Sequence, residues 1–186
     1  MGKKKHKKRD AASSAPRTSP DAVDAAIAAW RRECPALDVT SAGVVSRVTQ
    51  LAARFTQALE MASAQHGLTK ASFEALAVLR RSGRPCRLSQ TRLMQELALT
   101  PGTVSARISR LAGDGLVKRL PDPGDRRGVI VALTDKGESA FESIVDQHLA
   151  TERRLLAALD AGEQDVLAGL LRRLLQDVQP AARGVE

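Results

Sequence analysis

Apolar residues recur with helical spacing in four segments of the chain. They fall three and four positions apart over residues 21–33, over residues 41–66, from residue 134 to residue 159, and again up to residue 178 after a break predicted at Ala161-Gly162. A period of about 3.6 residues predicts an amphipathic helix in each segment. Three of these helices, one at the start of the chain and two at its end, carry more apolar surface than one small wing can cover, which favours a homodimer over packing within a single chain.

Three further helices are predicted in the middle of the chain from their first residues. Thr134 can cap the helix predicted from residue 134 to residue 159, and Thr69 and Ser89 are likewise residues that cap helices. Thr100 with Pro101 combines an N-cap with a proline in the first turn. The helix that begins there runs to Asp114 and has an apolar row and, about 100° around its axis, a polar row. The apolar row is Val104, Ile108 and Leu111, and the polar row is Thr103, Arg107 and Arg110.

Two short strands are predicted after these helices. Residues 116–120 and 129–133 are rich in apolar and β-branched side chains, and residues 121–127 between them form a basic loop of turn residues. The composition agrees with a largely helical protein, because 43% of the residues are hydrophobic but only 2% are aromatic. We therefore predict a mostly α fold with a small β-wing, the winged helix-turn-helix, in a chain whose 186 residues fit one domain.

Positive charge is concentrated at the start of the chain. Residues 1–19 hold seven lysines and arginines against one aspartate, so this segment carries +6 of the formal net charge of +8. A basic tail raises the affinity for any nucleic acid without reading its sequence, and it equally has the composition of a solubilising disordered arm. Sequence-specific recognition must therefore come from the other residues.

Several classes of function lack support in the sequence. The basic start is followed by a polar stretch and not by the apolar core of a signal peptide, and no apolar run approaches the roughly 18 residues of a membrane helix. Cys34 and Cys86 have no metal-ligand spacing, and no nucleophile motif or phosphate-binding glycine loop is present. We expect no enzyme activity and no catalytic residue, no metal or other cofactor, no membrane contact, and a location in a reducing cytoplasm.

A set of motifs follows in a fixed order from the third of the middle helices onward. The sequence Thr-Pro-Gly-Thr-Val-Ser-Ala-Arg-Ile-Ser-Arg-Leu begins at Thr100, Gly-Leu-Val begins at Gly115, Asp-Pro-Gly-Asp-Arg-Arg begins at Asp122, and Val-Ala-Leu-Thr-Asp-Lys-Gly ends at Gly137. In order and spacing, these motifs resemble the recognition helix, the wing and the start of the next helix in the MarR family of bacterial regulators. The resemblance covers approximately residues 41–178 and implies a location at the bacterial nucleoid.

The resemblance implies an obligate-type homodimer with interlocked terminal helices that represses transcription by binding a palindromic operator in double-stranded DNA. One recognition helix per subunit would enter the major groove, and the wing arginines would enter the adjacent minor groove. The residues expected to contact DNA are Ser89, Thr103, Ser105, Ala106, Arg107, Arg110, Arg126 and Arg127. Asp125 is expected to orient Arg127, because a carboxylate beside phosphates is repelled. The plainer alternatives are a contact to phosphate alone for Thr103 and Ser105, and an ion pair with an acid for Arg107. For Arg126 and Arg127 the plainer alternative is a solvated loop charge.

Trp30 is the only tryptophan and lies on an extra helix ahead of the usual start of this fold. That placement resembles the urate-responsive, PecS-like branch of the family, in which a tryptophan, an acid and two arginines surround a purine-derived ligand. The matching residues are Trp30, Glu74, Arg107 and Arg119, with Glu74 one methylene longer than the usual aspartate. The branch implies a small anionic aromatic effector such as urate that lowers the affinity for DNA. The alternative is that Trp30 anchors the extra helix and Glu74 forms a structural ion pair.

Two other functions stay open at this point. A redox-sensing regulator of the same family would oxidise Cys34, although this chain has no tyrosine to hydrogen-bond the thiol. A non-specific nucleic-acid-binding protein would depend on the basic tail. The predicted organisation is a disordered basic tail (1–20), N-terminal helices for dimerisation and the ligand pocket (21–66), the winged helix-turn-helix (67–134), C-terminal dimerisation helices (135–179) and a final tail (180–186).

Overall fold

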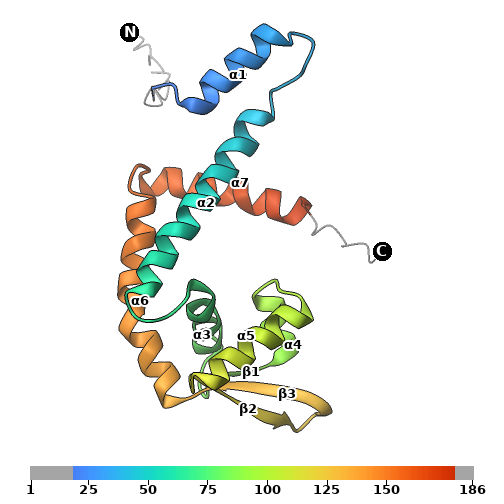
Figure 1. Ribbon diagram of the computed structural model, residues 1–186, viewed down its shortest axis with the longest axis vertical. Helices are drawn as coiled ribbons and strands as arrows, with labels where there is room; N and C mark the ends of the chain where they lie inside the picture. The colour runs from blue at the N-terminus through green and yellow to red at the C-terminus, as the bar shows by residue number, and fades with distance from the viewer. Residues whose placement is uncertain (1–18, 179–186) are drawn as a thin grey trace, which may run out of the picture. The chain divides into compact units, whose positions relative to one another are not determined.

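The computed structural model describes residues 19–178, so the predicted tails lie outside the described residues except for Ser19 and Pro20. The chain divides into two compact units, one up to Ala52 and one from Ala53 onward. The helices are α1 (Ala22–Glu33), α2 (Ala42–Ala64), α3 (Lys70–Arg81), α4 (Gln90–Glu96), α5 (Pro101–Gly113), α6 (Asp135–Leu155) and α7 (Ala161–Asp177) (Figure 1). The strands are β1 (Arg87–Ser89), β2 (Val117–Asp122) and β3 (Asp125–Leu133).

The first unit contains the extra N-terminal helix α1 and the beginning of α2. The side chain of Asp21 accepts hydrogen bonds from the amides of Val23 and Asp24, while the side chain of Asp24 accepts one from the Asp21 amide, which makes a capping box. A Cβ atom on Gly43 would lie 3.0 Å from Cδ1 of Ile27. The absence of a side chain at this position of α2 therefore permits the close approach of the two helices.

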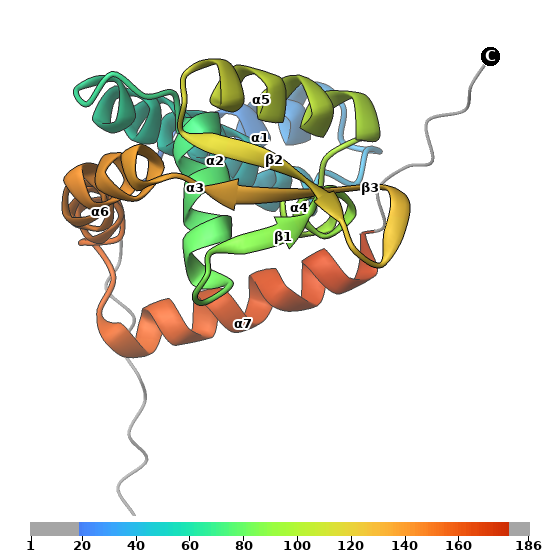
Figure 2. The same ribbon diagram turned by 90° about the horizontal axis from the view of Figure 1, so that it is seen from below.

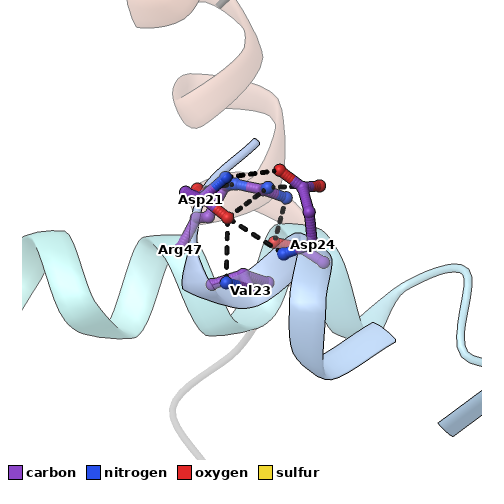
Figure 3. Close-up of polar contacts among 5 residues, drawn as sticks. Asp21, Val23, Asp24 and Arg47 are labelled. Atoms are coloured by element: carbon purple, nitrogen blue, oxygen red, sulfur yellow. Dashed lines mark hydrogen bonds and ion pairs between the residues drawn. The ribbon is translucent and has the colours of Figure 1, made fainter. Parts of the chain in front are cut away.

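Arg47 on α2 connects the two helices (Figure 3). Its Nε and Nη2 atoms donate hydrogen bonds of 2.9 Å and 2.8 Å to the two carboxylate oxygens of Asp21, and Nη2 also lies 2.8 Å from Oδ1 of Asp24. The hydrogen bond from Arg47, followed by that from the Asp24 amide, lowers the pKa of Asp21 to about 2. Such a two-pronged contact has a better defined geometry than most surface ion pairs.

We expect the contact between Asp21 and Arg47 to weaken as the pH falls from about 4 to about 2. A carboxyl group with a lowered pKa stabilises the folded arrangement above its ordinary pKa, and this contribution disappears as the pH falls through the lowered value. Trp30 is the only tryptophan and lies on α1, so its fluorescence anisotropy reports the mobility of that helix. The anisotropy should fall over this pH range, with far-UV circular dichroism recording whether the other helices persist.

Arg47→Met is the matched control for this titration. The variant should show a lowered Trp30 anisotropy already at neutral pH, because Asp21 has lost its partner, and no further acid step. If Arg47→Met showed an acid step as large as that of the unmodified protein, the ion pair would not be its cause.

Threonine and serine N-caps begin four helices of the second unit, as the sequence predicted. The side chains of Thr69, Ser89, Thr100 and Thr134 accept hydrogen bonds from amides in the first turns of α3, α4, α5 and α6. These helices pack their apolar sides together around one core. Its fully buried large side chains include Leu76, Leu79, Leu93, Val104, Ile108, Leu111 and Val131.

A three-stranded antiparallel sheet completes the second unit, with β3 between β1 and β2 (Figure 2). β1 is not among the predicted strands, because three residues are too few to show an alternating pattern. β3 begins at Asp125 and not at Val129, so the predicted loop over residues 121–127 is wrong in length. Only Pro123 and Gly124 turn the chain, and the Asp122 side chain accepts a 2.9 Å hydrogen bond from the Gly124 amide.

The break between the last two helices is displaced from its predicted position. α6 ends at Leu155 and not at Leu159, and Ala161-Gly162 form the first turn of α7. The reason is a capping box in which the side chains of Asp160 and Glu163 each accept a hydrogen bond from the other residue's amide. This cap starts a helix despite the low helix propensity of glycine.

The outer helices carry large apolar side chains that the chain itself leaves exposed. α7 has no buried residue. The exposed apolar residues of α7 and its C-cap are Val166, Leu170, Leu171, Leu174, Leu175 and Val178, and those of α2 are Val44, Val45, Val48, Leu51 and Met61. Between residues 19 and 178, no helix is both long enough and apolar enough to cross a membrane.

Candidate nucleic-acid interface

α5 exposes a polar side next to the apolar side that it buries. Its apolar row is buried as predicted. On the polar side, Thr103, Ala106 and Arg110 are exposed, whereas Ser105 and Arg107 are half-buried. The Thr100 hydroxyl accepts a 3.3 Å hydrogen bond from the Thr103 amide, which fixes the first turn. A helix with one packed side and one free side can enter the major groove of DNA.

Arg107 does not extend freely from α5 but lies against α3. Its Nη1 atom is 3.6 Å from Oε2 of Glu74, and only 17% of its side chain is exposed. Lys70, one turn earlier on α3, donates a hydrogen bond to the other carboxylate oxygen of Glu74. The structure therefore brings together two of the four predicted ligand residues, Glu74 and Arg107.

Arg119 has partners on α5. Its Nη2 atom donates a 2.8 Å hydrogen bond to the Ser109 hydroxyl and a 3.4 Å one to the Ser105 carbonyl oxygen, which links β2 to α5. Within residues 53–178, no ion pair joins it to Glu74. Trp30 lies on α1 in the first unit with 52% of its surface exposed. The four-residue ligand set predicted from the resemblance thus stays a prediction.

The wing places two arginines on a bulge of β3. The register between β2 and β3 shifts near the tip, so that residues 126–128 have no partner on β2. Arg126 and Arg127 within this bulge are exposed. The Asp125 carboxylate accepts a 2.9 Å hydrogen bond from the Arg127 amide. This contact fixes the backbone of Arg127, and an orienting effect on its guanidinium stays a prediction.

Ser89 and Glu96 lie at the two ends of α4. The Ser89 hydroxyl accepts a 3.2 Å hydrogen bond from the Arg92 amide and caps the helix. Glu96 pairs with Arg81 on α3 at 3.0 Å and with Arg92 at 2.7 Å. The Arg81 guanidinium, followed by that of Arg92, holds the pKa of the Glu96 carboxyl below its ordinary value. The pair between Arg81 and Glu96 joins α3 to α4, and the pair between Arg92 and Glu96 lies within α4.

Glu74 and Arg107 line two different cavities. The larger, of 570 Å³, is lined mainly by α3 and α6 and includes Lys70 and Glu74. Its aromatic lining is Phe73, Phe141 and His148, in which the Phe73 ring stacks on Phe141 at 5.6 Å and lies 4.2 Å from the His148 ring. The smaller, of 450 Å³, lies between the start of α3 and α5 and is lined by Thr103, Ala106, Arg107 and Arg110, among others.

Lys70 and His148 are not among the predicted site residues. The spacing of Lys70 and Glu74, four residues apart on a predicted helix, is the signal that indicates their contact. His148 meets Phe73 only because α6 packs against α3, and no local pattern indicates that contact. Cys34 is half-buried at the end of α1 and Cys86 is buried. Among residues 19–178, no cluster of three metal-binding side chains occurs.

The chain is similar to known regulators along most of its length. Residues 66–128 match the family model described as MarR family. The HTH-type transcriptional regulator PecS of Dickeya dadantii is 32% identical over 145 residues, which cover 78% of this chain and 87% of PecS.

Two solved structures show the same fold. Sco3205, a MarR family transcriptional regulator from Streptomyces coelicolor in complex with DNA, has a TM-score of 0.72 and 24% identity over 81% of this chain and 95% of its own. Bordetella bronchiseptica BpsR, whose DNA binding is regulated by 6-hydroxynicotinic acid, has a TM-score of 0.63 and 27% identity over 70% of this chain and 97% of its own. The predicted winged helix-turn-helix fold is confirmed. The chain belongs to the MarR family of DNA-binding transcriptional regulators, whose members are not enzymes.

Proposed function

We propose that this protein is a homodimeric repressor that binds a palindromic operator and is released from it by a small anionic aromatic ligand. Two features found together carry the proposal: α5 has an exposed polar side, and the wing has two arginines exposed on a bulge. Family membership supplies the DNA-binding activity. The exposure of the side chains supports the assignment of different DNA contacts to different residues.

We assign base contacts to the exposed side of α5. Thr103, Ala106 and Arg110 are exposed there, and an arginine on a recognition helix can donate two hydrogen bonds to guanine in the major groove. Arg126 and Arg127 are assigned to the adjacent minor groove, whose negative potential attracts arginine. The remaining predicted contacts come from Ser89, Ser105 and Arg107. We assign them to the DNA backbone, or to contacts that form only when the side chain turns outward, because these side chains are half-buried.

The exposed apolar faces of α2 and α7 support a homodimer. They contain large aliphatic side chains that one chain leaves in contact with solvent, and surfaces of this kind mark association sites. A two-fold dimer presents two recognition helices, which matches an operator with two half-sites in successive major grooves. A dimer bound in this way at a promoter would exclude the polymerase from the nucleoid DNA, and we therefore propose repression.

An aromatic anion suits the larger cavity by its chemistry. The rings of Phe73 and His148 supply aromatic surface, and Lys70 and Arg81 supply positive charge. Three carboxylates also line the cavity, those of Glu74, Glu96 and Glu152, and the first two are paired with these cations. Regulation of BpsR by 6-hydroxynicotinic acid is support from a relative that responds to a ligand of this class. Trp30 is proposed as a ligand-binding residue by resemblance alone.

The test is a gel-shift titration on the DNA upstream of the protein's own gene, compared with scrambled DNA of equal length at fixed salt. Selective binding that urate releases would support the repressor and the ligand class together. Selective binding that is indifferent to urate would retain the regulator and reject urate as its ligand. Equal binding to both DNAs would reject the proposal.

Trp30→Ala should abolish the response to urate and leave the affinity for DNA within about twofold, since the resemblance assigns Trp30 to ligand binding and not to the DNA interface. The expected change is measured by repeating the titration with and without urate. Leu37→Ala is the matched control, because it removes another exposed apolar side chain from the first unit. A Trp30→Ala variant that urate still releases from DNA would remove this residue from the proposed site.

A further inference from the structure

The carboxylate of Glu74 is shared between two cations. Lys70 donates a hydrogen bond to Oε1. Arg107 approaches Oε2 from α5, but at 3.6 Å this contact is an ion pair without a hydrogen bond, since N–H···O bonds extend to about 3.2 Å. All three side chains are partly shielded from solvent, with exposed fractions of 24% for Lys70, 37% for Glu74 and 17% for Arg107. Their mutual attraction is therefore screened less than that of fully exposed charges.

The three charges connect the two cavities. Lys70 and Glu74 line the larger cavity between α3 and α6. Arg107 lines the smaller one, which Thr103 and Arg110 of the recognition helix also border. The Glu74 carboxylate therefore joins a cation of the larger cavity, Lys70, to a cation of the smaller one, Arg107.

We propose that Lys70 is a positioning residue that keeps Arg107 available to DNA by competing for Glu74. When Lys70 occupies the carboxylate, the hold on Arg107 is weak and the guanidinium can turn toward phosphate. When Lys70 is withdrawn, Glu74 has Arg107 as its one remaining cation and retains it against α3. The inference rests on the proposed function, because it assumes that Arg107 contributes to DNA binding.

The direction of an effector's action follows from this competition. An anionic group that enters the larger cavity and pairs with Lys70 leaves Glu74 to Arg107, so the affinity for DNA falls. A cationic group that pairs with Glu74 releases Arg107, so the affinity for DNA rises. The charge on the ligand, and not its shape alone, therefore sets the sign of regulation.

A double-mutant cycle tests the competition without any ligand. The dissociation constant for the protein's own upstream DNA is measured at fixed salt for Lys70→Met, Glu74→Gln and the double variant. Glu74→Gln should bind roughly two- to fivefold more tightly and Lys70→Met roughly two- to fivefold more weakly, as expected for one partly exposed ion pair. In the Glu74→Gln background, Lys70→Met should have no further effect, because the carboxylate for which Lys70 competes is gone.

Three controls make the cycle decisive. Glu142→Gln removes the same charge from an exposed position on α6 outside both cavities and should leave the affinity unchanged. Lys70→Arg keeps the cation and should restore the binding that Lys70→Met loses. Thermal unfolding of each variant shows that the fold is intact.

The outcomes separate the possible errors. If Lys70→Met weakens binding equally with and without Glu74, Lys70 acts on DNA as a direct charge and the inference is overturned. If Glu74→Gln binds no more tightly than Glu142→Gln, Glu74 does not hold Arg107 and the inference is likewise overturned. If the unmodified protein does not prefer its upstream DNA to scrambled DNA, the proposed function is overturned, and the inference that rests on it is overturned with it.

Discussion

Gly137→Ala should lower the free energy of unfolding by about 3 kcal/mol, at the upper end of the usual cost of overpacking. Gly137 lies in the first turn of α6, directly after the wing. A Cβ atom there would lie 2.0 Å from the carbonyl oxygen of Leu116 and 3.0 Å from its carbonyl carbon. The collision is with backbone, so a change of rotamer cannot relieve it.

The surroundings of Gly137 leave the backbone little freedom to yield. The Leu116 carbonyl accepts a 3.2 Å hydrogen bond from the Thr134 amide, and the Thr134 hydroxyl accepts a 3.0 Å hydrogen bond from the Gly137 amide. Leu133 closes the other side, with Cδ2 3.3 Å from the added Cβ. A shift large enough to admit the methyl group would break the N-cap of α6 or the hydrogen bond from the Thr134 amide to the Leu116 carbonyl.

Chemical denaturation at one protein concentration measures the loss, because the stability of the proposed dimer would depend on concentration. Gly113→Ala is the control, since a Cβ atom at that helical position meets no atom within 4 Å. It should leave the stability unchanged or raise it by up to about 1 kcal/mol, because alanine favours helix. Equal stabilities of the two variants would show that α6 can move away from Leu116 at no cost.

Local signals in the sequence account for much of the second unit. The N-caps at Thr69, Ser89, Thr100 and Thr134 are predictable because a hydroxyl that accepts from the first turn depends on residues within three positions. The two faces of α5 are predictable for the same reason, since period and burial are properties of one helix. The capping box at Asp160 is equally local, and it indicates the start of α7 more strongly than the following glycine indicates a break.

Contacts between distant segments were beyond such reasoning. β1 exists because β3 offers it a partner more than forty residues later. The bulge that exposes Arg126 and Arg127 depends on the register with β2. Arg119 was predicted to meet a ligand, but a resemblance in sequence cannot show that its guanidinium is hydrogen-bonded to Ser109 on α5.

Removing both wing arginines should weaken DNA binding about 10- to 100-fold and affect operator and scrambled DNA to a similar extent. The minor groove to which these arginines are assigned attracts them through its negative potential, and each cation that neutralises a phosphate charge steepens the slope of log affinity against log salt by about 0.9. Arg126 and Arg127 are exposed on the bulge, and the nearest carboxylate on β3, that of Asp125, accepts from the backbone amide of Arg127. The Arg126→Ala/Arg127→Ala variant should therefore show a flatter salt dependence, measured by fluorescence anisotropy with labelled DNA.

Arg110→Ala should have the opposite signature, because Arg110 is exposed on α5 and is assigned to a base edge. Loss of a bidentate base contact costs about 1–3 kcal/mol for the correct sequence and little for other sequences. The variant should thus lose the preference for its upstream DNA while its salt slope changes by no more than about one per subunit. Comparison of the two variants on both DNAs distinguishes residues that recognise base sequence from residues that bind DNA of any sequence. If Arg110→Ala weakened binding to operator and scrambled DNA by the same factor, Arg110 would be a phosphate contact, and base recognition would have to come from the first turn of α5, where Thr103 and Ala106 are exposed.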